Sequence, residues 1–262
     1  MGVCSLCGRA SKIVSRSVGV CYECLTKRAG ALTFSRTTHA SYRGSLGLPE
    51  AVPEEGGRRC VLCVNECSIG DGRVGYCGLW RNEGGLLKHV AGLNKFLGLW
   101  YLDPHPTNCV AGPVCPANTG RGYPKYTLTE GVEVGYSNLA VFFGGCMLNC
   151  LFCQNFEHKE MVAKALKGGF KTLVSVDEVV EVGLSDKVSC VCFFGGDPGP
   201  HAPQALAIAR KLLTLSSGKV KRVCWETNGL ENPSVMSEMA KMTLSPLLKA
   251  GFHCWVLSDT PP

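Results

Sequence analysis

Cysteine is the residue that most constrains this chain, because it fills 17 of the 262 positions. An odd number of thiols cannot pair completely as disulfides within one chain. No basic segment followed by an apolar run opens the sequence, which disfavours a secreted disulfide scaffold. No uncharged apolar run reaches the roughly 18 residues of a membrane-spanning helix. We therefore expect a soluble, cytoplasmic protein without a membrane partner, whose cysteines hold metal.

Length and composition indicate a folded chain of about two domains. The sequence is 45% hydrophobic and 18% charged, which supplies enough apolar material for a buried core. Four segments are expected. They are a zinc-ribbon-like module at 1–30, a linker or irregular wrap at 31–57, a Cys/Gly-rich segment at 58–137 and an α/β domain at 138–262.

The first segment has the spacing of a zinc ribbon. Two C-x2-C pairs are formed by Cys4, Cys7, Cys21 and Cys24. Such pairs suit four thiolates around a tetrahedral Zn²⁺. A segment this short also needs a metal staple, because it cannot bury a sufficient core.

A second set of four cysteines consists of Cys60, Cys63, Cys67 and Cys77. All-thiolate sets suit both Zn²⁺ and iron–sulfur clusters, so this set is expected to hold Zn²⁺ or an auxiliary cluster. One of its ligands could instead be Cys109 or Cys115, which otherwise join a further site or remain ordinary thiols. Four more thiols fall on expected buried strands, where free cysteine behaves as a small hydrophobic residue: Cys190, Cys192, Cys224 and Cys254.

Strand and helix patterns alternate from residue 138 onward. Short apolar runs, two of them ended by Gly-Gly, predict strands, and N-cap and proline signals predict helices. The expected strands are 138–143, 188–194, 219–225 and 252–257, and the expected helices are one beginning at Ser175, 203–215 and 233–242. This alternation predicts an α/β fold with a parallel sheet, whose chemistry lies at the carboxyl ends of the strands.

Three cysteines with the spacing C-x3-C-x2-C directly follow the first of these strands: Cys146, Cys150 and Cys153. Three thiolates can hold three irons of a [4Fe–4S] cluster, which leaves the fourth iron open to bind a small molecule. A structural metal knuckle, or a fourth ligand from elsewhere in the chain, is the alternative. The spacing favours the cluster.

This motif, with an aromatic residue before its last cysteine, resembles the signature of the radical S-adenosylmethionine (SAM) superfamily. The flanking Phe-x-Gly-Gly-Cys and Cys-Gln-Asn are most similar to the branch related to pyruvate formate-lyase activating enzymes. The resemblance implies a (β/α) barrel with a SAM-binding cluster. It also implies reductive cleavage of SAM to a 5′-deoxyadenosyl radical that abstracts hydrogen, from a protein glycine in activase-like members. Flavodoxin or ferredoxin would be the reductant.

Two further strand ends resemble SAM-binding elements of these enzymes. The first is similar to a Gly-Gly-Glu-Pro element that holds the methionyl amino group, with Asp in place of Glu: Gly195, Gly196 and Asp197. The second resembles an acid-Thr-Asn-Gly segment that holds SAM or a neighbouring cation, and its alternative is a strand-ending turn: Glu226, Thr227 and Asn228. His201 either faces this site or is a surface or helix-start residue.

The end of the sequence departs from the family pattern. Barrels of this superfamily have six β/α units, whereas four strands are expected here. Leu257-Ser258-Asp259 stands where activating enzymes have Asp-Leu-Lys. We therefore expect a partial, truncated barrel in an incomplete chain that is weakly active or inactive alone.

Two other classes of function compete with the enzyme. The ribbon and the basic residues of segment 1–58 favour a nucleic-acid or protein binding module, and the short barrel favours an inactive, cluster-binding scaffold. The formal net charge of +6 counts every thiol as neutral. Two four-thiolate Zn²⁺ sites and one three-thiolate cluster lower it to about +1, which argues against a nucleic-acid partner.

Overall fold

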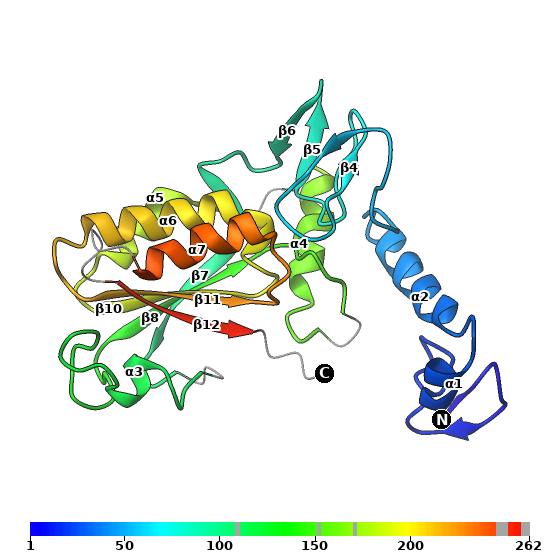
Figure 1. Ribbon diagram of the computed structural model, residues 1–262, viewed down its shortest axis with the longest axis horizontal. Helices are drawn as coiled ribbons and strands as arrows, with labels where there is room; N and C mark the ends of the chain where they lie inside the picture. Colours follow the sequence, from blue (N-terminus) through cyan, green and yellow to red (C-terminus); the bar gives the residue numbers. More distant parts are fainter. Residues whose placement is uncertain (108–110, 151–152, 170–171, 245–250, 258–262) are drawn as a thin grey trace. The chain divides into compact units, whose positions relative to one another are not determined.

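The computed structural model describes residues 1–107, 111–150, 153–169, 172–244 and 251–257 (Figure 1). Two compact units divide the chain, Met1–Val52 and Pro53–Pro262. Their boundary falls within the expected linker at 31–57. The finer division into four segments remains a prediction.

The N-terminal unit combines a short ribbon with two helices. Strands β1 (Gly2–Val3) and β2 (Ala10–Ser11) pair antiparallel, and α1 (Tyr22–Lys27) and α2 (Leu32–Ser45) follow. Its small core consists of Cys4, Val14, Val20, Cys21, Cys24 and Ala31.

Helix α2 corrects the expectation of an irregular segment, because it takes up 14 residues of the stretch from 31 to 57. Its serines and threonines weaken the sequence signal for a helix. Within the helix such a side chain can bond to the backbone of the preceding turn. Thr38 Oγ1 does so, donating to the Phe34 carbonyl at 3.0 Å.

The second unit is built on a six-stranded mixed sheet in the order β12-β11-β10-β8-β7-β9. Four of its strands are parallel neighbours in chain order, which confirms the predicted parallel sheet: β8 (Ser137–Phe143), β10 (Val188–Phe194), β11 (Lys221–Thr227) and β12 (Gly251–Leu257). Strand β7 (Lys95–Pro104) runs antiparallel to β8 and was not predicted. The short β9 (Leu173–Ser175) pairs with the other side of β7. Over the residues that the structure describes, this sheet is open at β12 and β9 and does not close into a barrel.

Three helices cover one face of the sheet, namely α5 (Val176–Gly183), α6 (Ala202–Leu215) and α7 (Pro233–Leu244) (Figure 1). Their positions confirm the predicted helices. Alternate strand residues point toward them and form the apolar core, among them Leu139, Val141, Val191, Phe193, Val223 and Trp225. Burying each large apolar side chain stabilises the fold by about 1.5–3 kcal/mol. Because strand residues alternate between faces, the intervening residues point to the opposite face.

Helix α5 begins at the predicted cap. The Ser175 hydroxyl accepts a hydrogen bond from the Asp177 backbone N–H at 3.2 Å, and the Glu178 carboxylate accepts one from the Ser175 backbone at 3.5 Å. This capping box satisfies N–H groups that the first helical turn leaves unpaired. It fixes the point where the chain turns from β9 into the helix layer.

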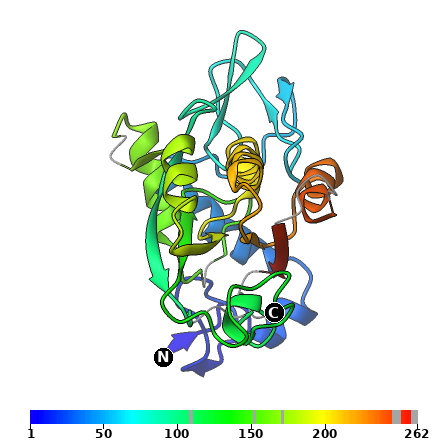
Figure 2. The same cartoon turned by 90° about the vertical axis from the view of Figure 1, so that its left-hand side faces the viewer.

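Two small hairpins and three short helical segments complete the second unit. The hairpins pair β3 (Arg58–Arg59) with β4 (Ser68–Ile69) and β5 (Trp80–Glu83) with β6 (Leu86–His89), and the helical segments are α3 (Pro116–Thr119), α4 (Glu157–Leu166) and η1 (Gly199–His201). The β5–β6 hairpin and the α3 segment lie at opposite ends of this unit (Figures 1 and 2). Among the described helices, none is both long enough and apolar enough to cross a bilayer.

Candidate functional site

The carboxyl ends of β8 and β10 bring two glycine pairs into contact. A Cβ atom on Gly196 would lie 2.2 Å from the Gly145 carbonyl oxygen and 2.4 Å from that of Phe143. Gly196 and Gly145 also have positive φ angles, of 56° and 91°. Only glycine allows this backbone approach, so both pairs shape the loop that carries the first cysteine of the motif.

That cysteine, Cys146, accepts two hydrogen bonds at its sulfur. Leu148 donates its backbone N–H at 3.3 Å, and Asn228 donates its side-chain N–H at 3.4 Å. Burial, reinforced by the charge of Asp197, holds the pKa of the Cys146 thiol well above its usual range. Hydrogen bonds donated to a sulfur stabilise the thiolate that a metal ligand must provide, so this position fits metal ligation.

The other two cysteines of the motif lie near α4. Burial and the neighbouring Cys153 raise the pKa of Cys150. Cys153 Sγ lies 3.7 Å from His158 Nε2, and the Lys159 ammonium donates to the Cys150 carbonyl at 2.9 Å. The aromatic residue of the signature, Phe152, falls outside the described residues. The structure thus keeps all three thiols at one end of the sheet.

A buried acid network lies next to Cys146. Asp197 accepts backbone N–H groups from Gly199 and Asn228, each at 2.8 Å. The Thr227 hydroxyl lies 3.1 Å from Asp197 Oδ2 and 2.5 Å from Glu231 Oε1. Burial first, and the charge of Glu231 second, hold the pKa of Asp197 well above its usual range.

Among the described residues, no positively charged side chain contacts this network. Asp197 and Glu231 are almost fully buried, and Glu231 Oε2 has no hydrogen-bond partner. One Thr227 hydroxyl carries a single proton, which cannot serve both carboxylates. A cationic group bound here would satisfy both acids. Glu231 was missed from the sequence, although an acid four residues after Thr227 was a signal available there.

Two further residues singled out from the sequence, Glu226 and His201, are at least partly buried. Glu226 is half-buried near the end of β11. His201 is fully buried at the start of α6, where its Nε2 lies 2.7 Å from the Gly144 carbonyl oxygen and its ring stacks on Phe143. Of the two interpretations left open for His201, the structure favours the helix start. Through its contact with the Gly144 carbonyl, His201 supports the loop that carries the first glycine pair.

An apolar cavity of about 310 Å³ opens beside the second glycine pair. Three aromatic rings line this side of the sheet as a stack, with Phe142 lying 5.6 Å from Tyr101 and 5.3 Å from Phe194. A Cβ atom on Gly195 would lie 2.3 Å from the Phe142 ring, which explains why glycine stands there. The cavity lining also contains polar groups, from Asn155, Glu157 and His158. The cavity has room for an organic group.

The second cysteine set packs against the same end of the sheet. In Cys60, Cys63 and Cys77, the backbone N–H group two residues downstream donates to the sulfur and lowers the pKa of the thiol. Burial has the larger, opposite effect on each of them. The pKa is therefore raised, to about 11 for Cys63 and about 12 for Cys77. The fourth sulfur, of Cys67, accepts from the Tyr76 backbone at 3.4 Å. The charges of Cys60 and Cys67 both raise the pKa of Cys63 and Cys77, so these thiols influence one another electrostatically.

Backbone contacts attach this cysteine loop to the motifs described above. Val64 donates to the Leu230 carbonyl at 2.9 Å, and Asn232 donates to the Leu62 carbonyl at 3.0 Å. The Asn65 side chain donates to the Met147 carbonyl, within the cluster motif, at 2.9 Å. A metal that orders the loop would therefore also order the Cys146 loop.

The N-terminal set can hold one metal ion. In the part of the chain that the structure describes, it is the group whose ligand atoms all lie within 4.8 Å of one another: Cys4, Cys7, Cys21 and Cys24. A hydrogen bond from the Cys21 backbone lowers the pKa of Cys4 to about 6, whereas burial raises the pKa of Cys24 to about 12. The thiols of the central motif are less tightly grouped, as expected where each would bind a separate iron.

Of the remaining cysteines, four have side chains that the structure describes and two do not. Cys190, Cys192 and Cys224 are buried as predicted, but on the sheet face opposite the helices, where they form a cluster of their own. Cys115 is half-buried. Cys109 and the side chain of Cys254 lie outside the described residues.

Residues 140–248 match the family model of the Radical SAM superfamily. No curated protein and no solved structure matches the chain. The matched stretch contains the three-cysteine motif, both glycine pairs and the acid network. This part of the chain is therefore similar to a radical SAM superfamily domain, and that family implies a [4Fe–4S] cluster and SAM.

Proposed function

We propose that this part of the chain is a radical SAM domain that reductively cleaves SAM to a 5′-deoxyadenosyl radical for hydrogen abstraction. Cys146, Cys150 and Cys153 are the proposed ligands of its [4Fe–4S] cluster. When bound, the cluster supplies the electron that splits SAM, and the radical so formed removes hydrogen from a C–H bond of the substrate. The chain's own residues hold and orient these groups.

One observation carries the proposal, namely the continuous contact between the cysteine motif and the acid network. Asn228 joins them, because its side chain donates to Cys146 Sγ at 3.4 Å and its backbone donates to Asp197 at 2.8 Å. SAM carries an α-amino group that is cationic at neutral pH. The uncompensated pair of Asp197 and Glu231 fits such a cation, and Cys146 fits a metal-bound thiolate.

For the substrate we propose a protein glycine, as in activating enzymes, with flavodoxin or ferredoxin as the electron donor. The Phe-x-Gly-Gly-Cys and Cys-Gln-Asn flanks support this choice of branch. The apolar cavity beside Gly195 supports binding of an organic group next to the motif. Electron paramagnetic resonance (EPR) after incubation with candidate glycyl radical enzymes and SAM would show a glycine-centred radical. Absence of that signal while SAM is still cleaved would redirect the search to other substrates.

For the other cysteine sets we propose Zn²⁺ at Cys4, Cys7, Cys21 and Cys24, and Zn²⁺ or an auxiliary iron–sulfur cluster at Cys60, Cys63, Cys67 and Cys77. The N–H donors to sulfur in both sets fit thiolate ligands. Zinc, iron and sulfide content, measured in chains lacking one set at a time, identifies each metal.

The test of the enzyme is anaerobic reconstitution, reduction and addition of SAM, with 5′-deoxyadenosine measured by chromatography. We expect product from the intact chain and none above background from Cys150→Ala, which should also lose cluster absorbance. Lys164→Ala, on the exposed side of α4, is the matched control and should retain both. A full cluster without 5′-deoxyadenosine would support the inactive scaffold instead.

A further inference from the structure

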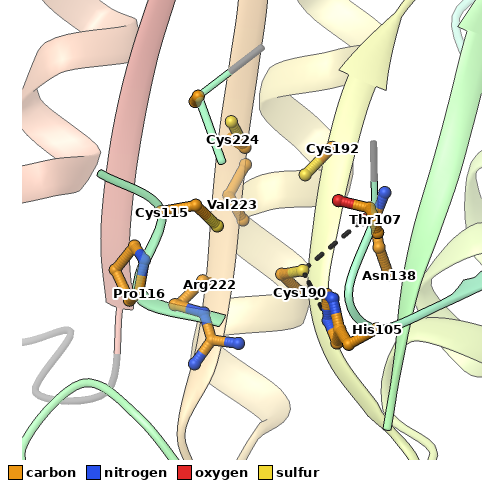
Figure 3. A pocket seen from close by; sticks show the side chains of 11 residues that line it. His105, Thr107, Cys115, Pro116, Asn138, Cys190, Cys192, Arg222, Val223 and Cys224 are labelled. Carbon is orange, nitrogen blue, oxygen red and sulfur yellow. Dashed lines mark hydrogen bonds between the residues drawn. The ribbon is translucent and has the colours of Figure 1, made fainter. Parts of the chain in front are cut away.

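A small cavity of about 20 Å³ lies on the sheet face opposite the helices (Figure 3). It faces β8, β10 and β11 upstream of the strand ends that carry the cysteine motif and the acid network. On the side away from the sheet, its lining comes from described residues between β7 and β8, namely His105, Thr107, Ala111, Cys115 and Pro116. Its lining includes one imidazole, one amide and four thiols, from His105, Asn138, Cys115, Cys190, Cys192 and Cys224.

Strand geometry determines the positions of three of these thiols. Cys190 and Cys192 are two residues apart on β10 and therefore point to the same face. Cys192 is also the direct register partner of Cys224 on β11. The fourth thiol comes from the residues between β7 and β8, where Cys115 precedes α3. Figure 3 shows the four thiols around one shared space, approached from two strands and a loop.

All four thiols line the same cavity. Cys190 Sγ also contacts polar groups of the lining, at 3.5 Å from Asn138 Oδ1 and 3.6 Å from His105 Nε2. The four sulfurs therefore share one enclosed, partly polar space.

The surroundings differ from those of an apolar core. His105 Nε2 lies 3.6 Å from Cys190 Sγ and 3.0 Å from the Ser189 hydroxyl, while the buried His105 Nδ1 has no partner. Arg222 lines the cavity and forms a buried ion pair with Glu133 at 2.5 Å. The helix-covered face of the same strands carries Val, Leu, Phe and Trp instead. Packing alone would favour such residues here and would leave no cavity.

We propose that Cys115, Cys190, Cys192 and Cys224 bind one thiophilic divalent metal ion, with Zn²⁺ as the probe. Four thiolates suit a tetrahedral Zn²⁺, and each thiol that ligates releases its proton to solvent. A cavity of about 20 Å³ admits one water-sized ion rather than an iron–sulfur cluster. The hydrogen bond between His105 and Cys190 orients a ligand from outside the metal sphere.

The ion draws its ligands together. In the described residues the four sulfurs are spaced more widely than those of the N-terminal set, which lie within 4.8 Å. Cys115 precedes α3 and lies outside the sheet, so the proposed ion would draw this residue toward the strand thiols. Metal binding thus fastens the loop at Cys115 onto the sheet.

The test is thiol labelling of the full chain, followed residue by residue with peptide mass spectrometry. The chain is stripped of metal by a chelator under anaerobic conditions and is then alkylated with and without Zn²⁺. Cys115 is half-buried, so its labelling rate reports the site. At a Zn²⁺ concentration 100 times the Kd, we expect labelling of Cys115 to slow about 100-fold. An unchanged rate would overturn the proposal.

Two variants separate metal binding from folding. Cys190→Ala should remove the protection of Cys115, whereas the matched control Val191→Ala, which trims the same strand on its helix face, should retain it. Cys115→Ser alters only the loop and should lower bound zinc by one equivalent. Equal protection of Cys115 in Cys190→Ala, or iron with acid-labile sulfide held at these thiols, would contradict a single-ion site.

Discussion

Replacing Glu231 by Gln tests the buried acid pair without SAM or metal. The substitution keeps the shape of the side chain and removes one of two like charges. Glu231 Oε2 has no partner at present, so the new amide group takes the place of an unpaired oxygen. It also places an N–H donor next to the neighbouring carboxyl of Asp197. We expect the variant to be more stable than the parent chain at neutral pH.

The magnitude follows from the contacts with Thr227. Its hydroxyl oxygen lies 3.1 Å from Asp197 Oδ2 and 2.5 Å from Glu231 Oε1. The two carboxylate oxygens are therefore at most about 6 Å apart, where two unit charges repel by about 3 kcal/mol at an effective dielectric constant of 20. Proton uptake by Asp197 relieves part of this repulsion. We expect a gain of about 1–3 kcal/mol in the free energy of unfolding.

The gain depends on pH. Because the pKa of Asp197 is raised above its ordinary value of 3.8, its favourable contribution is complete below that value and is lost as pH rises through the raised pKa. The advantage of Glu231→Gln over the parent chain in free energy of unfolding should therefore be larger at pH 8 than at pH 5. Urea unfolding at both pH values measures the two free energies.

Glu238→Gln is the matched control, because the Glu238 side chain is 41% exposed and pairs with Arg210 and Lys241. It should change stability little at either pH, since exposed ion pairs contribute little. A Glu231→Gln chain that is less stable than the parent at pH 8, or a gain that is the same at pH 5, would refute the reasoning.

Three further predictions rest on separate parts of the structure. Gly196→Ala places a Cβ atom 2.2 Å from the Gly145 carbonyl oxygen, so the reconstituted chain should hold less iron; unchanged iron content would count against the glycine contact. Glu133→Gln leaves the buried Arg222 without its charged partner and should lower the free energy of unfolding in urea by about 3–5 kcal/mol. Glu130→Gln, at a nearby exposed position, should lower it little. Removing metal from the Cys4–Cys24 set should speed proteolysis within Met1–Val52, because little else holds this small core; an unchanged cleavage rate would show that the unit folds without metal.

Periodicity and capping signals were enough to predict the parallel sheet. The apolar runs before Gly144 and Gly195 became β8 and β10, and Ser175 became the cap of α5. Strand β7 was missed because it contains Gly98 and ends at Pro104, two residues that disfavour strands. Gly98 is required there, since a Cβ atom would lie 2.3 Å from the Phe142 carbonyl oxygen. That contact forms only when β7 pairs with β8.

The candidate site was predictable where a motif lies within one segment and less so where it depends on register. Asp197 and Thr227 stand in recognisable strings, and the structure joins them by a hydrogen bond. The link from Asn228 to Cys146 spans 82 residues and has no local signal. The sulfur-lined cavity likewise depends on the pairing of Cys192 with Cys224, which sequence spacing does not reveal.

The central claim is that the cysteine motif and the acid network form one SAM site. The EPR spectrum of the reduced cluster, recorded with and without SAM, tests it most directly. We predict that SAM changes the spectrum of the intact chain, and that Glu231→Gln requires a higher SAM concentration for the same change. A reduced cluster whose spectrum is identical with and without saturating SAM would contradict the account.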